Sequence, residues 1–230
     1  MHLCEGSTFS FGNLGQLSLA ASFINKLQQV SIPQNVSLKE EEVLVMPKSE
    51  ELYWRRSMTE FNECVYQHIV SIADRVNADI KILNLCLKII EESDLHNNYN
   101  KLKFTLSHGE MQGQNVLFRG CDEISVVDWD SISIRPAIYD IAMSVCFFCR
   151  KSRGRFLIDR DIYSWYIRHF QLNNMEKKYL AVYLLLVFLP DVKLLEEYLN
   201  YDNKKAKWYI DWSCEALKDI LLGLSESQFS

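Results

Sequence analysis

A short stretch in the middle of the chain, residues 103–130, has a different hydrophobic pattern from the segments around it. It contains three short runs bounded by Gly or Asp and rich in β-branched and aromatic residues: KFTLSHG (103–109), NVLFRG (115–120) and ISVVDWD (124–130). Runs of this kind predict β-strands. Elsewhere apolar residues recur at helical spacing, and the chain has only 8 Gly and 4 Pro to interrupt helices. The sequence therefore predicts a mainly α fold with a small β-hairpin element.

Helices are expected on both sides of this element. Asn13 can cap a helix whose apolar positions run from Leu17 to Leu27, and the segment 79–93 has the same spacing. The helix after the β element is expected to start at Pro136, because proline suits the first turn of a helix. Further helices are expected at about 61–76, 159–171, 175–188, 191–200 and 203–222. The 230 residues then form one domain, with helices over 13–100, a loop and hairpin over 104–130, and helices over 136–224.

Charge and composition argue against several classes of protein. The formal net charge is −5, so the chain lacks the basic surface on which nucleic-acid binding depends. Its longest apolar run, 180–189, is shorter than the ~20 residues that a membrane span needs, and predicts a buried core helix. The N-terminus has no basic and apolar signal segments, and seven irregularly spaced cysteines favour a reducing compartment. We expect a cytoplasmic protein that binds neither nucleic acid nor membranes.

Polar side chains occur where the predicted strands end. If residues 115–128 fold as a hairpin with its turn centred on residues 121–122, antiparallel pairing places Asn115 opposite Asp128. Asp130 points to the same side as Asp128, because side chains alternate along a strand. The loop that enters this end of the hairpin contains Glu110.

A group of carboxylates and an amide at one end of a hairpin has two interpretations. Oxygen ligands of this kind suit Mg²⁺, and a carboxylate that does not bind the metal can accept a proton from a nucleophile. Alternatively, Asp128, Asp130 and Asn115 only shape the turns at the strand ends, and Glu110 is solvated. Spacing alone leaves both interpretations open.

Three motifs resemble those of the aminoglycoside phosphotransferase and choline kinase family, which has a protein-kinase-like fold. They are HGEMQGQN (108–115), VVDWD (126–130) and PAIYDIA (136–142). The family's catalytic loop reads H-G-D-x-x-x-x-N, its metal-binding strand ends in D-[WF]-[DE], and its next helix carries P-x-x-x-D-[LIV]-A. All three motifs appear in the family's order and spacing. The resemblance runs from about residue 1, where LCEGSTFS (3–10) looks like the segment leaving the hinge, to the C-terminal helices.

The resemblance implies roles for the residues that match these motifs. Glu110 takes the place of the catalytic aspartate, which orients or deprotonates the hydroxyl of the acceptor. Asn115 and Asp128 would be the magnesium ligands, with Asp128 bridging the metal to the phosphates of ATP. Asp130 would lie behind these ligands.

Two further residues would support the catalytic loop by hydrogen bonds to its backbone, namely His108 and Asp140. The activity that the resemblance implies is transfer of the γ-phosphate of ATP to a hydroxyl of a small molecule, with an aminoglycoside-like or choline-like acceptor. The nucleotide and this acceptor would be the ligands of the chain.

The sequence departs from the family pattern in two ways. Glu110 stands where the family has Asp, which keeps the charge and lengthens the side chain. Residues 1–10 already look like the hinge, so we expect the chain to be the large C-terminal lobe alone, without the N-terminal lobe that clamps ATP. A second chain or a homo-oligomer would then complete the site. The alternatives are a pseudokinase-like binding or regulatory module without catalysis of its own, and a structural remnant.

Overall fold

A mostly helical architecture with two small sheets is found in the computed structural model, which describes residues 6–31, 71, 74–75, 79–152, 154–190 and 203–225. The helices are α1 (Leu14–Leu27), α5 (Ile80–Glu92), α6 (Leu95–Asn98), the 3-10 helix η3 (Tyr99–Lys101), α7 (Ile138–Phe148), α8 (Arg160–Ile167), α9 (Asn174–Leu186) and α11 (Asn203–Ser225). The strands are β1 (Phe104–Ser107), β2 (Val116–Arg119), β3 (Glu123–Val126) and β4 (Ser133–Pro136). The predicted mainly α fold with a small β element is confirmed.

Two of the expected helices cannot be compared with the structure in full. The one at 191–200 lies outside the described residues. The one at 61–76 also lies outside them, apart from residues 71, 74 and 75, which are helical.

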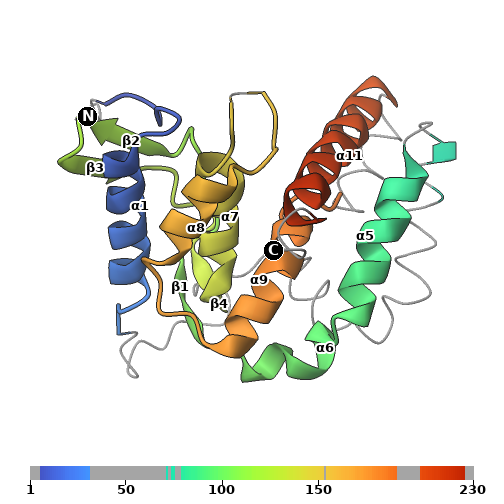
Figure 1. Cartoon of the computed structure of the whole chain (residues 1–230), viewed down its shortest axis with the longest axis horizontal. Helices are drawn as coiled ribbons and strands as arrows, with labels where there is room; N and C mark the ends of the chain where they lie inside the picture. The colour runs from blue at the N-terminus through green and yellow to red at the C-terminus, as the bar shows by residue number, and fades with distance from the viewer. Residues whose placement is uncertain are drawn as a thin grey trace.

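The helices pack side by side across the molecule in an order that differs from their order in the chain (Figure 1). At one side, α1 lies beside the β2–β3 hairpin, and α1 packs on α7 and α8. In the middle α7 packs on α9, and at the other side α11 packs on both α9 and α5. The apolar faces of these helices form one continuous core, which includes Leu17, Val145, Leu184 and Ile220.

Two helices form for the reasons that the sequence indicated. The Asn13 side chain accepts a hydrogen bond from the Gln16 N–H at 3.1 Å and so caps α1, whose residue Ile24 is fully buried. The apolar run of α9 is a core helix, with Leu180 and Leu184 buried. Among the helices of the described ranges, none is both long enough and apolar enough to cross a membrane.

The β2–β3 hairpin has a different register from the predicted one. Arg119 pairs with Glu123, and the Val127 N–H donates to the Asn115 carbonyl at 2.9 Å. Asn115 therefore lies opposite Val127 and not opposite Asp128, so the prediction was wrong by one residue. The cause is the turn, which comprises residues 120–122 and uses Gly120 at a φ of 63°. Left-handed glycines are common in hairpin turns, and the three-residue loop here shifts the register by one residue relative to a turn centred on residues 121–122.

Strand β4 was not predicted, and Pro136 does not start a helix. Pro136 is the last residue of β4, which pairs antiparallel with β1 and places Pro136 opposite Phe104, whereas α7 begins at Ile138. Among the described residues this sheet contains only β1 and β4, so β4 is an edge strand there. A proline is tolerated there because its missing N–H removes no bond to a further strand.

A carboxylate of α11 binds the connection between α7 and α8. Asp219, which is buried, accepts hydrogen bonds from the Arg155 Nε at 2.9 Å and from the Phe156 N–H at 2.8 Å. The hydrogen bond from Arg155 lowers the pKa of the Asp219 carboxyl from its usual 3.8, although burial opposes this shift. The folded state therefore stabilises the ionised form of the Asp219 carboxyl.

The stability contributed by Asp219 is expected to depend on pH. Because its pKa is lower in the folded than in the unfolded state, this contribution is present above pH 3.8 and is lost as the pH falls through the folded-state pKa. The difference in unfolding free energy between the parent and Asp219→Asn should be largest near neutral pH. It should shrink as the pH falls below 3.8. Urea denaturation at a series of pH values measures this, with Asp211→Asn on the more exposed side of α11 as control. A difference that stays constant down to acid pH would contradict the assignment.

Candidate functional site

The loop that connects β1 to β2, residues 108–115, is held by a carboxylate from the first turn of α7. The two oxygens of Asp140 accept hydrogen bonds from the backbone N–H groups of His108, at 2.8 Å, and of Gly109, at 3.0 Å. Asp140 is only 2% exposed, and burial raises the pKa of its carboxyl, while the two N–H donors act in the opposite direction. The start of the loop is therefore fixed to the helical core.

His108 connects the same loop to the end of β3. Its Nδ1 accepts from the Glu110 N–H at 3.3 Å, and its Nε2 lies 3.1 Å from the Val127 carbonyl. These two contacts together require the neutral ring with its proton on Nε2, which donates to Val127. The ring is fully buried and packs edge-on against Trp129, with the centroids 4.6 Å apart. His108 thus joins the loop to the end of β3 through both ring nitrogens.

Glu110 and Asn115, at the two ends of the loop's polar segment, contact each other directly. The Asn115 amide nitrogen lies 3.2 Å from both the Glu110 backbone carbonyl and the Glu110 Oε2 atom. The other carboxylate oxygen of Glu110, Oε1, accepts a hydrogen bond from the Ser131 hydroxyl at 2.6 Å. Since the amide nitrogen of the buried Asn115 faces Glu110, its Oδ1 is the atom that remains to bind a cation.

Asp128 follows β3 in a conformation that is uncommon for a residue with a side chain. Its φ is 63°, in the left-handed region, and its side chain is exposed. Non-glycine residues in this region carry a conformational cost and are found at functional sites more often than elsewhere. Asp130, two residues further on, is also exposed. The structure thus brings Glu110 and Asn115 into contact and places both aspartates just beyond β3, at the end of the hairpin that Asn115 begins.

The ligand atoms present here suit a hard cation that keeps other oxygen ligands. Asn115 offers an amide oxygen and Asp128 a carboxylate, the donor types that Mg²⁺ prefers. In the ranges that the structure covers, no three His, Cys, Asp or Glu side chains gather into a complete metal cluster. Magnesium commonly binds one or two protein carboxylates and completes its shell with waters and substrate phosphates. The residues fit a site of that kind.

Sequence reasoning missed three residues that follow Asp130. Ser131 contacts Glu110, as described above, and its backbone carbonyl accepts from the Ser133 hydroxyl at 3.2 Å. The Ser133 hydroxyl accepts in turn from the Arg135 Nε at 2.6 Å. No motif marks these residues, because their contacts depend on the turn after β3. The available signal was the polar–apolar alternation of residues 131–135, which predicts a strand.

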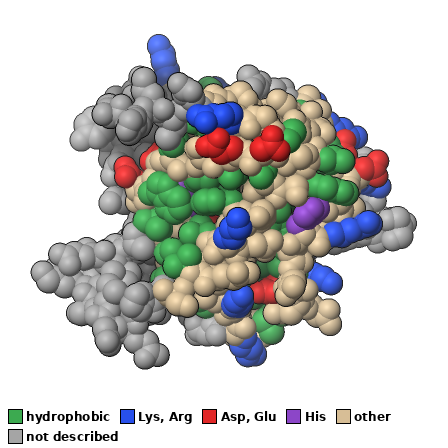
Figure 2. Space-filling view, turned by 90° about the vertical axis from the view of Figure 1, so that its left-hand side faces the viewer, with side chains coloured by type: hydrophobic (Ala, Val, Ile, Leu, Met, Phe, Trp, Pro, Cys, Tyr) green, Lys and Arg blue, Asp and Glu red, His purple; other side chains and the backbone are tan. Residues whose placement is uncertain are grey.

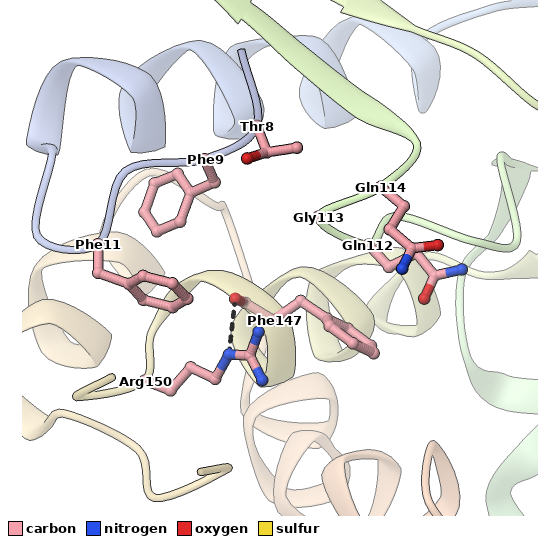
Figure 3. Close-up of a pocket in the computed structure, with 8 residues that line it drawn as sticks. All are labelled: Thr8, Phe9, Phe11, Gln112, Gly113, Gln114, Phe147 and Arg150. Carbon is pink, nitrogen blue, oxygen red and sulfur yellow. Dashed lines mark hydrogen bonds between the residues drawn. The ribbon is translucent and has the colours of Figure 1, made fainter. Parts of the chain in front are cut away.

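A cavity of about 350 Å³ opens beside the loop (Figure 3). It is lined by Thr8, Phe9, Phe11, Gln112, Gly113, Gln114, Phe147 and Arg150. Figure 3 shows the two glutamines of the loop on one side and Phe9 and Phe11 of the N-terminal segment on the other. The Arg150 guanidinium, 5.2 Å from the centre of the Phe11 ring, comes from the segment just after α7. The volume suits a small organic molecule.

The face of the molecule at the α1 side carries hydrophobic side chains that gather into a patch, with charged side chains around it (Figure 2). Among the large hydrophobic side chains that are exposed are Leu14, at the start of α1, and Trp129, just after β3. Exposed apolar groups of this kind frequently mark surfaces that bind another protein.

Comparison with known proteins gives a family and a fold. Residues 16–165 match the model of a family described as the phosphotransferase enzyme family, APH. No curated protein matches the sequence. Similar solved structures include the AMP-bound spectinomycin phosphotransferase APH(9)-Ia, with a TM-score of 0.60, 13% identity, and coverage of 95% of this chain and 70% of that one.

Two further structures agree with this. The Plasmodium vivax ethanolamine kinase has a TM-score of 0.57 and 13% identity, over 99% of this chain and 65% of that one. The ADP-bound aminoglycoside phosphotransferase APH(2'')-Ib has a TM-score of 0.51 and 15% identity, over 93% of this chain and 71% of that one. The chain therefore has a kinase-like phosphotransferase fold, as the sequence motifs predicted.

Replacing Asp140 by Asn should loosen the loop. Asparagine offers one acceptor oxygen in place of two, so one backbone N–H would face an amide NH₂, and we expect a loss of roughly 2 kcal/mol in unfolding free energy. Hydrogen exchange of the His108 and Gly109 amides, which now donate to Asp140, should become faster. Urea denaturation and amide exchange measure the two effects. Asp122→Asn, in the exposed hairpin turn, is the control, and unchanged protection of both amides would disprove the anchoring role.

Proposed function

Because the chain belongs to the phosphotransferase enzyme family, we propose that it transfers the γ-phosphoryl group of ATP to a hydroxyl group of a small molecule. The observation that carries this proposal is the contact between Glu110 and Asn115 beside the exposed carboxylate of Asp128. A proton-accepting group and two oxygen ligands then lie at one end of one hairpin. The nucleotides bound to the similar phosphotransferases, AMP and ADP, support a nucleotide as the phosphoryl donor.

In this proposal the ends of the loop and of β3 hold the donor. Asn115 Oδ1 and the Asp128 carboxylate would bind Mg²⁺, which neutralises charge on the phosphate oxygens when it is bound. The exposed position of Asp128 keeps its carboxylate accessible to a metal–nucleotide complex. Asp130 would not contact the metal itself and would instead support these two ligands. His108 and Asp140 would keep the backbone of the loop in place through the hydrogen bonds described above.

Glu110 would orient the acceptor hydroxyl and take its proton. Each carboxylate oxygen can accept two hydrogen bonds, and Ser131 and Asn115 use one position on each. Positions therefore remain on both oxygens for a hydroxyl donor. Phosphoryl transfer depends mainly on positioning and on charge stabilisation, so a carboxylate held by two donors is suited to this role.

We place the acceptor in the cavity beside the loop. The family resemblance implies an aminoglycoside-like or choline-like acceptor, both of which are cationic. Among the described residues that line the cavity, none carries a carboxylate. The charged side chain at the cavity is Arg150, whose guanidinium already lies over the Phe11 and Phe147 rings, 5.2 and 5.5 Å from their centroids. The amides of Gln112 and Gln114 would then meet the hydroxyls of the acceptor. Because Arg150 would repel an ammonium group, the part of the acceptor that enters this cavity would be an uncharged part that carries hydroxyls.

We also propose that the residues described here form the large lobe of a two-lobed site. The loop, the hairpin end and the cavity provide the acceptor side and the metal side. The residues that cover the nucleotide would come from a small lobe outside these residues. The hydrophobic patch at the α1 side supports a docked partner at that face (Figure 2).

Titration calorimetry of magnesium–ATP into the chain tests the donor site. Binding of magnesium–ATP to the parent should release heat. The Asp128→Ala variant should show no such heat, because it lacks one of the two proposed metal ligands. Asp122→Ala, at the other end of the same hairpin, should bind as the parent does. Circular dichroism checks that all three proteins are folded.

Equal binding by the parent and Asp128→Ala would contradict the proposed metal site. Absence of binding by the parent would mean that these residues do not form a nucleotide site alone. The proposal would then hold only together with a small lobe, and the alternative of a pseudokinase-like binding module would be favoured.

A further inference from the structure

Glu110 is longer than the aspartate that the family's loop carries, and a serine from beyond β3 contacts its carboxylate. We propose that Ser131 is a positioning residue, whose hydroxyl holds Glu110 Oε1 at 2.6 Å and so makes a glutamate usable at this position. This inference rests on the proposed function and adds a residue that no motif of the family marks.

A glutamate in this position needs such support. It has one more rotatable bond than aspartate, so its carboxylate reaches more positions unless contacts restrict it. Phosphoryl transfer requires the proton acceptor at a defined distance from the hydroxyl, and displacements of about 1 Å can cost about a hundredfold in rate. The hydrogen bonds from Ser131 to Oε1 and from Asn115 to Oε2 hold one oxygen each. Together they fix both the position and the plane of the carboxylate.

Ser131 is itself held rigidly against the loop. Gly109 has a φ of 86°, and a Cβ at that residue would lie 2.3 Å from the Ser131 carbonyl oxygen. Glycine is therefore needed for the segment after β3 to approach the loop this closely. The same carbonyl accepts from the Ser133 hydroxyl, which is bound by the buried Arg135. The position of the Ser131 hydroxyl is thus set by the backbone and by the core below it.

This arrangement predicts that aspartate, the family's usual residue at position 110, would give a lower reaction rate in this chain than Glu110 does. Shortening Glu110 to Asp withdraws the carboxylate by about 1.5 Å, the length of one carbon–carbon bond. The present 2.6 Å contact would then open to about 4 Å if the backbone stays in place, which is too long for a hydrogen bond. An aspartate would lose its contact with Ser131 and the restriction that comes with it.

The test is steady-state hydrolysis of magnesium–ATP by the full chain, with water as the acceptor. Ser131→Ala should lower kcat about tenfold while KM for ATP stays the same, since positioning acts on the reacting group and not on nucleotide binding. Ser131→Thr keeps the hydroxyl and should restore most of the rate. Glu110→Asp should lower kcat as well. Ser131→Ala in the Glu110→Asp background should then cause little further loss, because the contact is already absent. Ser152→Ala, in an exposed turn, is the control.

The outcomes separate this inference from the function on which it rests. If the parent hydrolyses ATP and Ser131→Ala does not change kcat, or changes it equally in both backgrounds, the positioning role is overturned and the proposed function stands. A higher kcat for Glu110→Asp than for the parent would overturn it too. If the parent binds magnesium–ATP in the calorimetry but hydrolyses it no faster than Glu110→Gln does, the proposed function fails, and the positioning role fails with it.

Discussion

The buried carboxylate of Asp140 is the contact on which the geometry of the site depends. It lies in the first turn of α7, which packs on α1 and α9. It accepts hydrogen bonds from two consecutive backbone N–H groups of the loop. Burying a carboxylate is costly unless its oxygens are hydrogen-bonded, so these bonds favour the observed placement of the loop on the helix. The loop therefore takes its position from the helical core. A surface connection alone would not hold Glu110 in place.

A second set of contacts fixes the end of β3 to the same loop. His108 donates to the Val127 carbonyl, and the Val127 N–H donates to the Asn115 carbonyl, so both ends of the loop are tied to one residue of the hairpin. The supporting groups are buried or belong to the backbone, whereas Asp128 and Asp130 are exposed. The two exposed aspartates are thus carried by a frame of buried and backbone groups. This separation is what a preorganised site requires.

The sequence predicted those parts of the molecule that local patterns determine. The Asn13 cap and the buried face of α9 follow from helical spacing, and the loop residues from 108 to 115 follow from a motif. The hairpin register did not follow, because it depends on a single left-handed glycine, Gly120, in the turn. Strand β4 was missed because its partner β1 lies on the far side of the hairpin in sequence. The contact of Ser131 with Glu110 depends on both of these features, and no pattern within one segment encodes it.

The consequence of having Glu110 where the family has Asp depends on the residues that contact its carboxylate. In a loop that had lost its role, a lengthened carboxylate would be free to turn towards solvent, which costs nothing. Here Glu110 is only half-buried and could do so, yet both of its oxygens are bound by donors from separate segments. One of these donors requires the close approach that Gly109 permits. Ordering a long acidic side chain reduces its conformational entropy, and surface hydrogen bonds return little of that. The arrangement therefore agrees better with the proposed use of this carboxylate than with a structural remnant.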